Sequence, residues 1–249
     1  GGIAAALGTE DTPEAHMQDT LVAGAGLCDP AAVRVLVEQG PEAVRRLIGW
    51  GAEFDRTPSG DIALTREGGH HTDRIAHAGG DATGWEILRA LVEEVGEKIQ
   101  VIEHALVLDI LQDATGATQG VTLHVIGEGQ IDGVGAILAP AVVLATGGIG
   151  QVFRASTNPP VATGDGVGAG LRAGAAVADM EFVQFHPTVM YLGAQASGQQ
   201  PLVSEAVRGE GATLLDDHRQ RFMAGVHPLE ELAPRDVVAR AIQDVMLTH

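Results

Sequence analysis

The sequence predicts an α/β fold, and three patterns support this class. Segments with helical spacing and helix-start signals fill the first 95 residues. From residue 99 the apolar residues favour strands, in three runs at 99–111, 120–126 and 136–145 that polar turns separate. A helix rich in small residues is expected at 164–176. The three runs predict a β-meander, and the helices before and after it predict the mixed class.

Helix boundaries in the first half are marked by prolines and capping residues. A Thr-Pro pair predicts a helix over 13–23, and an Asp-Pro pair predicts a second one over 30–37. A Gly-Pro pair at 40–41 is expected to end that helix, so a third is predicted over 42–48. The other elements expected in this half are a hairpin at 54–64 and an amphipathic helix at 85–95.

Composition limits the possible partners. Fifteen Lys and Arg residues against 33 Asp and Glu residues give a formal net charge of −18, which disfavours nucleic acid and anionic membrane surfaces. No run of 18 apolar residues occurs, so we expect no membrane span. The single cysteine, Cys28, excludes a disulfide within the chain and a cysteine-rich metal site, and it fits a reducing, cytoplasmic location.

The organisation of the chain predicts two domains. Near residue 179 apolar, glycine-rich segments give way to polar segments that carry His and Arg. We therefore expect one domain over 1–179 and a second over 180–249. The sequence starts within a small apolar run and stops within a helix that begins near residue 234, so we interpret it as an internal segment of a longer protein.

A glycine-rich turn follows the last predicted strand. Residues 141–145 are continuously apolar, as expected for a strand buried on both faces, and Thr146, Gly147 and Gly148 follow directly. Glycines here let the backbone approach a phosphate or a flat ring beyond the end of a strand, while a tight turn that leaves the sheet is an equal alternative. A G-x-G-x-x-A match at 168–173 follows no strand, so we assign its glycines to helix packing.

Two candidate ligand residues follow this turn. Asp165 stands at a predicted helix start, where it either caps the helix or holds a hydroxyl group of a ligand. His186 precedes Pro187, which restricts it to an extended conformation that can aim its ring from a strand end. A purely structural role is the alternative for such a lone histidine.

Two charged segments near the C-terminus are further candidates. Ser204, Glu205 and Arg208 place a hydroxyl, a carboxylate and a guanidinium beside two glycines, and the alternative is a solvated charged loop. The next predicted helix has Arg235 in its first turn, where the helix dipole disfavours a cation. This mismatch favours a function for Arg235, with Asp236 as its counter-ion when no ligand is bound. The alternative is a surface arginine paired with a neighbouring acid.

A third charged segment, 64–71, contains Glu67 and two adjacent histidines. Two histidines raise the question of a zinc site, but Asp73 and His77 do not complete a standard ligand spacing, so we expect no metal. A serine hydrolase is not supported either, because no G-x-S-x-G sequence occurs.

These segments together resemble the flavoprotein family of succinate dehydrogenase, fumarate reductase and L-aspartate oxidase. Six segments that occur in the order of that family, across essentially the whole chain, are 1–5, 145–148, 163–166, 181–188, 204–211 and 234–236. Three segments that are most similar to its L-aspartate oxidase branch are 18–28, 64–70 and 231–240.

The resemblance implies an FAD-binding, Rossmann-like domain, incomplete in this sequence, with a β-meander and an α+β substrate-capping domain. The residues it implies at the FAD cofactor are Gly1, Gly2, Thr146, Gly147, Gly148 and Asp165. Those it implies at a dicarboxylate substrate are His186, Ser204, Glu205 and Arg235. It further implies that Arg235 transfers a proton and that Glu67 faces the substrate amino group, with His186 as a third catalytic residue. Ser204 stands where the family usually has Thr, which keeps the hydroxyl.

The activity implied by the resemblance is oxidation of L-aspartate to iminoaspartate, with oxygen or fumarate as electron acceptor, as the first step toward quinolinate and NAD. Quinolinate synthase is then a candidate partner. The family's N-terminal G-x-G-x-x-G unit and its second flavin segment lie outside this sequence, so we expect the isolated 249-residue chain to bind FAD weakly or not at all. The alternatives are a fumarate reductase or succinate dehydrogenase flavoprotein fragment, and a truncated chain without catalysis.

Overall fold

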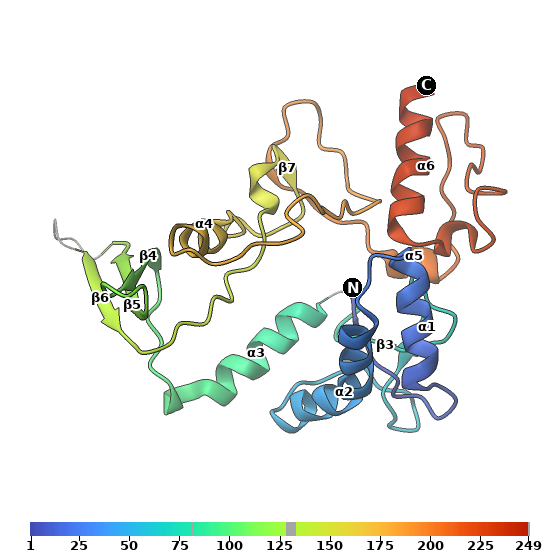
Figure 1. Cartoon of the computed structure of the whole chain (residues 1–249). Coiled ribbons are helices and arrows are strands. Elements are labelled where there is room, and N and C mark those ends of the chain that lie inside the picture. The colour runs from blue at the N-terminus through green and yellow to red at the C-terminus, as the bar shows by residue number, and fades with distance from the viewer. Residues whose placement is uncertain (81, 128–132, 249) are drawn as a thin grey trace. The chain divides into compact units, whose positions relative to one another are not determined.

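Both helices and strands occur along the residues that the computed structural model describes, which are 1–80, 82–127 and 133–248 (Figure 1). The chain forms two units, each held together by its own contacts. Unit 1 comprises Gly1–Ile99, Gln184–Thr188 and Val203–His249, and unit 2 comprises Gln100–Val183 and Val189–Leu202. The predicted α/β class is present, whereas the predicted division at residue 179 stays a prediction.

Two helices of unit 1 form where their sequence signals predict them. Helix α1 spans Pro13–Ala23, and the hydroxyl of Thr12 accepts a hydrogen bond of 3.1 Å from the amide of Ala15, as an N-cap residue does. Helix α3 spans Thr83–Val95 and packs into unit 1 through the fully buried Ala90. No helix in the described part of the chain is long and apolar enough to cross a membrane.

Helix α2 corrects one prediction. It spans Pro30–Gly49 without interruption, so the expected break at 40–41, with separate helices on either side, is wrong. Pro41 lies on the buried face, in line with Val37 and Val44. A proline inside a helix removes one backbone hydrogen bond and crowds the preceding turn. Burial of this apolar face in the core of unit 1 outweighs that cost.

Three two-residue strands form an antiparallel sheet in unit 1. Strands β1 (Ile3–Ala4), β2 (Leu64–Thr65) and β3 (Ile75–Ala76) are ordered β1-β3-β2. The hairpin expected before β2 is confirmed by an antiparallel bridge between Arg56 and Ile62. The buried residues of the adjoining core are Ala5, Val44, Ala52, Phe54, Ala76 and Ala90.

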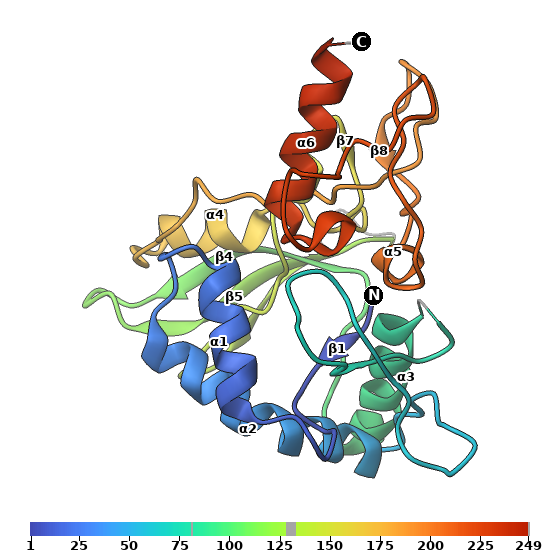
Figure 2. The same ribbon diagram turned by 90° about the vertical axis from the view of Figure 1, so that its right-hand side faces the viewer.

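The C-terminal segment of unit 1 forms a second apolar cluster. Its regular elements are helix α5 (Glu205–Gly209), the 3₁₀ turn η3 (Glu230–Leu232) and helix α6 (Arg235–Thr248). Met223 and Val238 are fully buried in the cluster. Both views place α5 close to the first turn of α6 (Figures 1 and 2), which brings the charged residues of the two helices together.

The predicted β-meander is confirmed in unit 2. Strands β4 (Ala105–Gln112), β5 (Thr118–Val125) and β6 (Val134–Leu138) pair antiparallel in chain order. Helix α4 (Asp165–Arg172) lies beside β4 (Figure 2), and its C-terminal arginine is 2.6 Å from the carboxylate of Asp109. The short elements that remain are η1 (Gly96–Lys98), η2 (Gly150–Val152), β7 (Ala155–Ser156) and β8 (Gly198–Gln199).

The segment after β6 differs from its prediction. We expected a strand over 136–145 with both faces buried at its end, but β6 ends at Leu138 and residues 141–145 belong to no strand. Val143 is 90% exposed. An apolar run becomes a buried strand only where neighbouring strands satisfy its backbone groups. The run has the composition of such a strand, but it has no pairing partner among the described residues.

A buried arginine ties the N-terminal elements of unit 1 together. The side chain of Arg74 is fully buried and donates hydrogen bonds of 2.9 and 2.8 Å to Asp11 and one of 2.8 Å to Asp19. Asp19 also accepts bonds from the amide and Nδ1 of His71, at 3.0 and 2.6 Å. Burial opposes ionisation of Asp19, but these bonds and the charge of Arg74 lower its pKa. The turn between β2 and β3 is thereby attached to helix α1.

We predict that Arg74→Met lowers the free energy of unfolding by about 3–5 kcal/mol, because two buried carboxylates lose their cation. Denaturant unfolding measures this change. Arg34→Met is the matched control, since Arg34 pairs with Glu38 at the surface, where such a pair contributes about 1 kcal/mol or less. Equal losses in the two variants would contradict a special role for Arg74.

Candidate functional site

Glu67, the residue expected to meet a substrate amino group, is buried beside a histidine. It lies two residues beyond strand β2 and is 7% exposed. Its Oε1 is 3.0 Å from Nε2 of His77, which directly follows strand β3. Nδ1 of the same ring is 3.1 Å from the hydroxyl of Thr65. Sequence reasoning considered His77 only as an unsuitable zinc ligand, because the strand pairing that brings it to Glu67 is not visible in the sequence.

The loop that carries Glu67 packs closely against the C-terminal segment. The amide of Gly69 donates a hydrogen bond of 3.0 Å to the carbonyl oxygen of Leu232. A Cβ atom on Gly68 would lie 2.9 Å from the carbonyl oxygen of Ala233, which is too close for any other residue without a shift of the backbone. The two glycines therefore bring the loop with Glu67 to the start of helix α6, within unit 1.

A line of paired charges runs inward from Arg235. Nη2 of Arg235 is 3.0 Å from Oε2 of Glu205, and Oε1 of Glu205 accepts a bond of 2.7 Å from Nη2 of Arg208. Glu205 and Arg208 are 4% and 5% exposed, so the alternative of a solvated loop is wrong for both. Arg208 also donates a bond of 2.6 Å to the carbonyl oxygen of Glu231. The line therefore joins a partly exposed guanidinium to two buried charged groups.

Arg235 lies in the first turn of α6, as predicted, but its counter-ion differs from the expected one. The helix dipole disfavours a cation there, and the ion pair with Glu205 offsets this cost. Gln184 adds an acceptor, its Oε1 lying 3.1 Å from Nη1 of Arg235. Asp236 instead pairs with Arg240, one turn further along the helix, at 2.6 Å. Gln184 was not singled out from the sequence, although it lies within the 181–188 segment.

His186 and Ser204 belong to the same unit. Nδ1 of His186 lies 2.8 Å from the carbonyl oxygen and 3.3 Å from the amide nitrogen of Thr188, so the backbone of Thr188 holds the ring in either tautomer. Burial lowers the pKa of His186, while the bond to Thr188 and the charge of Glu205 act in the opposite direction. The hydroxyl of Ser204 caps helix α5 by accepting a bond of 3.3 Å from the amide of Ala206. Ligand contacts of both side chains stay predictions.

The two adjacent histidines of the 64–71 segment have different partners. His71 pairs with Asp19, whereas His70 packs against His16 of helix α1 with ring centroids 5.7 Å apart. The Nδ1 atoms of His16 and His70 are buried without a hydrogen-bond partner among the described residues. Burial, followed by the charge of Arg74, lowers the pKa of both rings. This pair therefore stays neutral in the fold at neutral pH.

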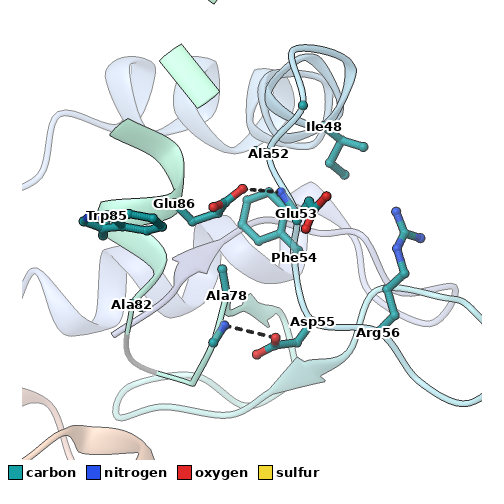
Figure 3. Close-up of a pocket in the computed structure, with 12 residues that line it drawn as sticks. Ile48, Ala52, Glu53, Phe54, Asp55, Arg56, Ala78, Ala82, Trp85 and Glu86 are labelled. Atoms are coloured by element: carbon teal, nitrogen blue, oxygen red, sulfur yellow. Dashed lines mark hydrogen bonds between the residues drawn. The ribbon is translucent and has the colours of Figure 1, made fainter. Parts of the chain in front are cut away.

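A cavity of about 800 Å³ lies elsewhere in unit 1, between helices α2 and α3 (Figure 3). None of the predicted site residues lines it. Two of the carboxylates that line it are engaged within the protein: Asp55 accepts a bond of 3.0 Å from the amide of Gly79, and Glu86 accepts one of 2.7 Å from the amide of Glu53. Hydrogen bonds from Arg89 lower the pKa of Glu86 to about 2. The candidate site is therefore identified by the line of charges and not by cavity size.

In unit 2 the glycine-rich turn closely approaches the start of helix α4. A Cβ atom on Gly166 would lie 1.8 Å from the hydroxyl oxygen of Thr146, so only glycine permits this approach. Gly147 has a φ of +70°, a conformation that favours glycine. Hypothetical Cβ atoms on Gly147 and Gly148 would meet nothing within 4 Å. The backbone of the turn thus leaves open space beside it.

Asp165 is the first residue of α4 and not its cap. The N-cap is Gly164, so the capping alternative for Asp165 is wrong. The exposed carboxylate of Asp165 accepts a hydrogen bond of 2.6 Å from the hydroxyl of Thr163. A Cβ atom on Gly170 would lie 3.3 Å from Cδ1 of Leu144, which supports the packing role assigned to the glycines of this helix.

A model of the family described as FAD binding domain matches residues 1–247. This chain belongs to that family. An L-aspartate oxidase of Streptomyces coelicolor is 69% identical over 250 residues, which cover 100% of this chain and 43% of that protein. An L-aspartate oxidase of Mycobacterium tuberculosis is 51% identical over 243 residues, which cover 97% of this chain and 45% of that protein.

Among solved structures, a quinol fumarate reductase of E. coli matches this FAD-binding domain with a TM-score of 0.90 at 34% identity, over 100% of this chain and 43% of that one. The fold is therefore the mixed α/β fold of the fumarate reductase flavoproteins. The chain spans less than half the length of these relatives.

The residues present in this FAD-binding domain fit the cofactor. In unit 2 the open space beside Gly147 and Gly148 adjoins the start of α4, where backbone amides favour a phosphate. The exposed carboxylate of Asp165 suits a ribose hydroxyl. In unit 1 a Cβ atom on Gly2 would lie 2.6 Å from the carbonyl oxygen of Ala76, so the backbone there is kept free of a side chain. Which of these residues touches FAD stays a prediction.

We predict that the His16–His70 pair makes the fold sensitive to acid. Both pKa values are lowered from 6.5 in the fold, so the unfolded chain binds protons more readily as pH falls below about 6.5. Each ring then removes up to about 1.4 kcal/mol of stability per pH unit, until the folded state also becomes protonated. The free energy of unfolding, measured from pH 5 to 7.5, should fall less steeply in a His16→Asn, His70→Asn double variant. Identical slopes would show that the pair does not contribute.

Proposed function

We propose that this chain is part of an L-aspartate oxidase, which uses FAD to oxidise L-aspartate to iminoaspartate. The observation that carries the proposal is the close packing of the Glu67 loop on the start of helix α6, through Gly69 and Leu232. This packing places a carboxylate for an ammonium group in the same unit as the cation Arg235 and the imidazole of His186. L-Aspartate carries an ammonium group and two carboxylates, so it needs groups of both kinds.

The site presents a partly exposed cation in a strongly acidic protein. The formal net charge is −18, so a dianionic ligand is repelled by most of the surface. Arg235 is 36% exposed in its side chain, and Arg208 behind it is buried. The planar guanidinium of Arg235 can hold a carboxylate through two parallel hydrogen bonds. We infer that one substrate carboxylate, when it binds, replaces part of the contact that Glu205 makes with the guanidinium of Arg235.

The chain's own residues bind the substrate and provide a path for the proton that it loses. Oxidation to the imine removes a hydride from Cα and one proton from the ammonium group, and FAD, when bound, would accept the hydride. An arginine stays protonated at neutral pH, so Arg235 serves as a clamp and as one end of a proton path, and it is poorly suited to be a free base. The contacts Arg235–Glu205–Arg208 supply the continuation of that path toward the interior.

His186 couples substrate binding to proton uptake in this proposal. Nδ1 faces the backbone of Thr188, so Nε2 is the ring nitrogen available to a ligand, and without a proton its lone pair repels a carboxylate. Protonation of Nε2 turns it into a donor, and a bound carboxylate favours that protonation. Ser204, which already caps α5, supplies a hydroxyl at the same end of the helix.

A fumarate reductase or succinate dehydrogenase flavoprotein is the second candidate, because the backbone matches that of a fumarate reductase over the whole chain. Succinate and fumarate have no ammonium group, so they leave a carboxylate at Glu67 without a role. For the L-aspartate oxidase we further propose that residues 180–249 are part of a capping domain and that oxygen or fumarate is the electron acceptor. We also propose a cytoplasmic location and quinolinate synthase as a partner.

We predict that Glu67→Gln in the flavin-loaded enzyme lowers kcat/KM for L-aspartate by about 10- to 100-fold, because one charge-assisted hydrogen bond to the ammonium is weakened. The introduced amide retains an oxygen that accepts the bond from His77, so the loop should keep its conformation. Fumarate reduction by the same variant is the control and should change little. Equal losses with both substrates would assign Glu67 a structural role.

We predict that Arg235→Leu reduces L-aspartate oxidation by about 100-fold or more, as removal of a preorganised charge at a reacting centre does. Arg235→Lys keeps the charge but loses the planar fork, so most of the activity should also be lost. Glu205 retains Arg208 as a partner, so both variants should remain folded. Peroxide release and thermal melting are the measurements.

Arg240→Leu is the matched control for these variants, because Arg240 lies on the same helix and pairs at the surface with Asp236. It should oxidise L-aspartate at the parent rate. Activity of Arg235→Leu within a few-fold of the parent would refute the assignment of Arg235.

A further inference from the structure

We propose that His77 is a positioning residue for Glu67 and thereby determines specificity for dicarboxylates that carry an α-ammonium group. The inference rests on the proposed function and concerns how that site distinguishes an amino acid from its deaminated analogue. It is carried by the hydrogen-bonded chain Thr65–His77–Glu67, in which both ring nitrogens have partners, at 3.1 and 3.0 Å.

The sheet of unit 1 explains why these side chains meet. Thr65 pairs with Ile75 across strands β2 and β3, and His77 lies two residues after Ile75. Side chains two residues apart along an extended chain share one face, so Thr65 and His77 are diagonal neighbours. Glu67 lies two residues after Thr65 and contacts the other nitrogen of the ring. The meeting of Thr65 and His77 thus follows from strand register, and the segment after β2 brings Glu67 to the other ring nitrogen.

The two partners determine the tautomer of His77. An ionised carboxylate only accepts hydrogen bonds, so the proton between His77 and Glu67 belongs to Nε2. Nδ1 of the neutral ring then accepts a bond from the hydroxyl of Thr65. In the opposite tautomer a lone pair on Nε2 would face Oε1 of Glu67 at 3.0 Å. Glu67 therefore selects the ring form that donates to it, and the hydroxyl of Thr65 can donate to the Nδ1 that this form leaves without a proton.

Gly2 holds the ring from the third strand. Ile3 pairs with Ala76, so Gly2 lies opposite His77. A Cβ atom on Gly2 would lie 2.9 Å from Nε2 of His77 and 2.4 Å from Cγ2 of Ile75. His77 is only 6% exposed. The ring is thus confined by two hydrogen bonds and by a backbone that approaches more closely than any side chain would allow.

This confinement gives Glu67 a defined orientation. His77 occupies Oε1, so Oε2 is the oxygen presented to an ammonium group. A ligand without an ammonium group gains nothing from that orientation. Loss of His77 should therefore weaken the binding of amino dicarboxylates and leave their deaminated analogues almost unaffected, whereas general damage to the site would weaken both.

The test measures equilibrium binding to the flavin-loaded enzyme by calorimetry. The probes are α-methyl-L-aspartate, which lacks the Cα hydrogen and cannot be oxidised, and methylsuccinate, which also lacks the amino group. In His77→Leu we expect the Kd of α-methyl-L-aspartate to rise about tenfold and that of methylsuccinate to change less than about twofold. His77→Gln can donate to Glu67 through its amide and should restore most of the discrimination, which is the ratio of the Kd of methylsuccinate to that of α-methyl-L-aspartate. Thr65→Val should lower the discrimination as His77→Leu does, but by a smaller factor.

His124→Leu is the matched control, because His124 is a partly buried histidine on strand β5 of unit 2, and it should change neither Kd. Equal weakening of both probes in His77→Leu, or unchanged discrimination in it, would overturn the inference. If His77→Leu does not fold, unchanged discrimination in Thr65→Val overturns it instead. A parent enzyme that binds the two probes equally would refute the proposed function, which is a different outcome.

Discussion

The ion pairs of Arg74 with Asp11 and Asp19 are the constraint on which the rest of unit 1 depends. A fully buried guanidinium is tolerated only when it is paired and hydrogen-bonded, and here three hydrogen bonds of 2.8–2.9 Å engage each of its three nitrogens. The same residue is part of the sheet, since its amide donates to Thr65 and its carbonyl oxygen accepts from Ala5. The charge cluster therefore holds helix α1 and the three strands in one arrangement.

This arrangement determines where the candidate site lies. The segment between β2 and β3 is held at one end by Arg74 and in its middle by His71, which is bonded to Asp19. Glu67 and His77 lie on either side of that attachment and face each other. Ordering a charged loop costs conformational entropy. If the loop became ordered only on ligand binding, that cost would weaken the binding. Here the cost is met on folding, so the carboxylate is oriented before a ligand arrives.

The second half of the site depends on a charge placed against a helix dipole. Arg235 at the start of α6 is unfavourable by itself, and the buried Glu205 compensates for it at 3.0 Å. Glu205 in turn is acceptable in the interior because Arg208 pairs with it. An arginine with a single strong partner and a partly exposed side chain can exchange part of that contact for a ligand carboxylate, whereas Arg74, fully buried among its partners, cannot.

Several features were determined by the sequence itself. The cap at Thr12, the amphipathic helix predicted over 85–95, the β-meander and the first-turn position of Arg235 follow from local patterns that involve only a few neighbouring residues. These features could be predicted because the hydrogen-bonding groups or the apolar face that define each of them come from residues close together in the sequence.

Other features were decided only by the tertiary structure. Helix α2 continues through Pro41 because distant residues cover its apolar face, and residues 141–145 are not a strand because no described strand pairs with them. The sequence likewise suggested Asp236 as the counter-ion of Arg235 and offered His77 only as an unsuitable zinc ligand, since Glu205 and Glu67 reach these residues through folding and not through spacing. Local sequence signals determine where a helix starts. The partner of a charged side chain depends instead on which segments pack together, and that is a property of the whole fold.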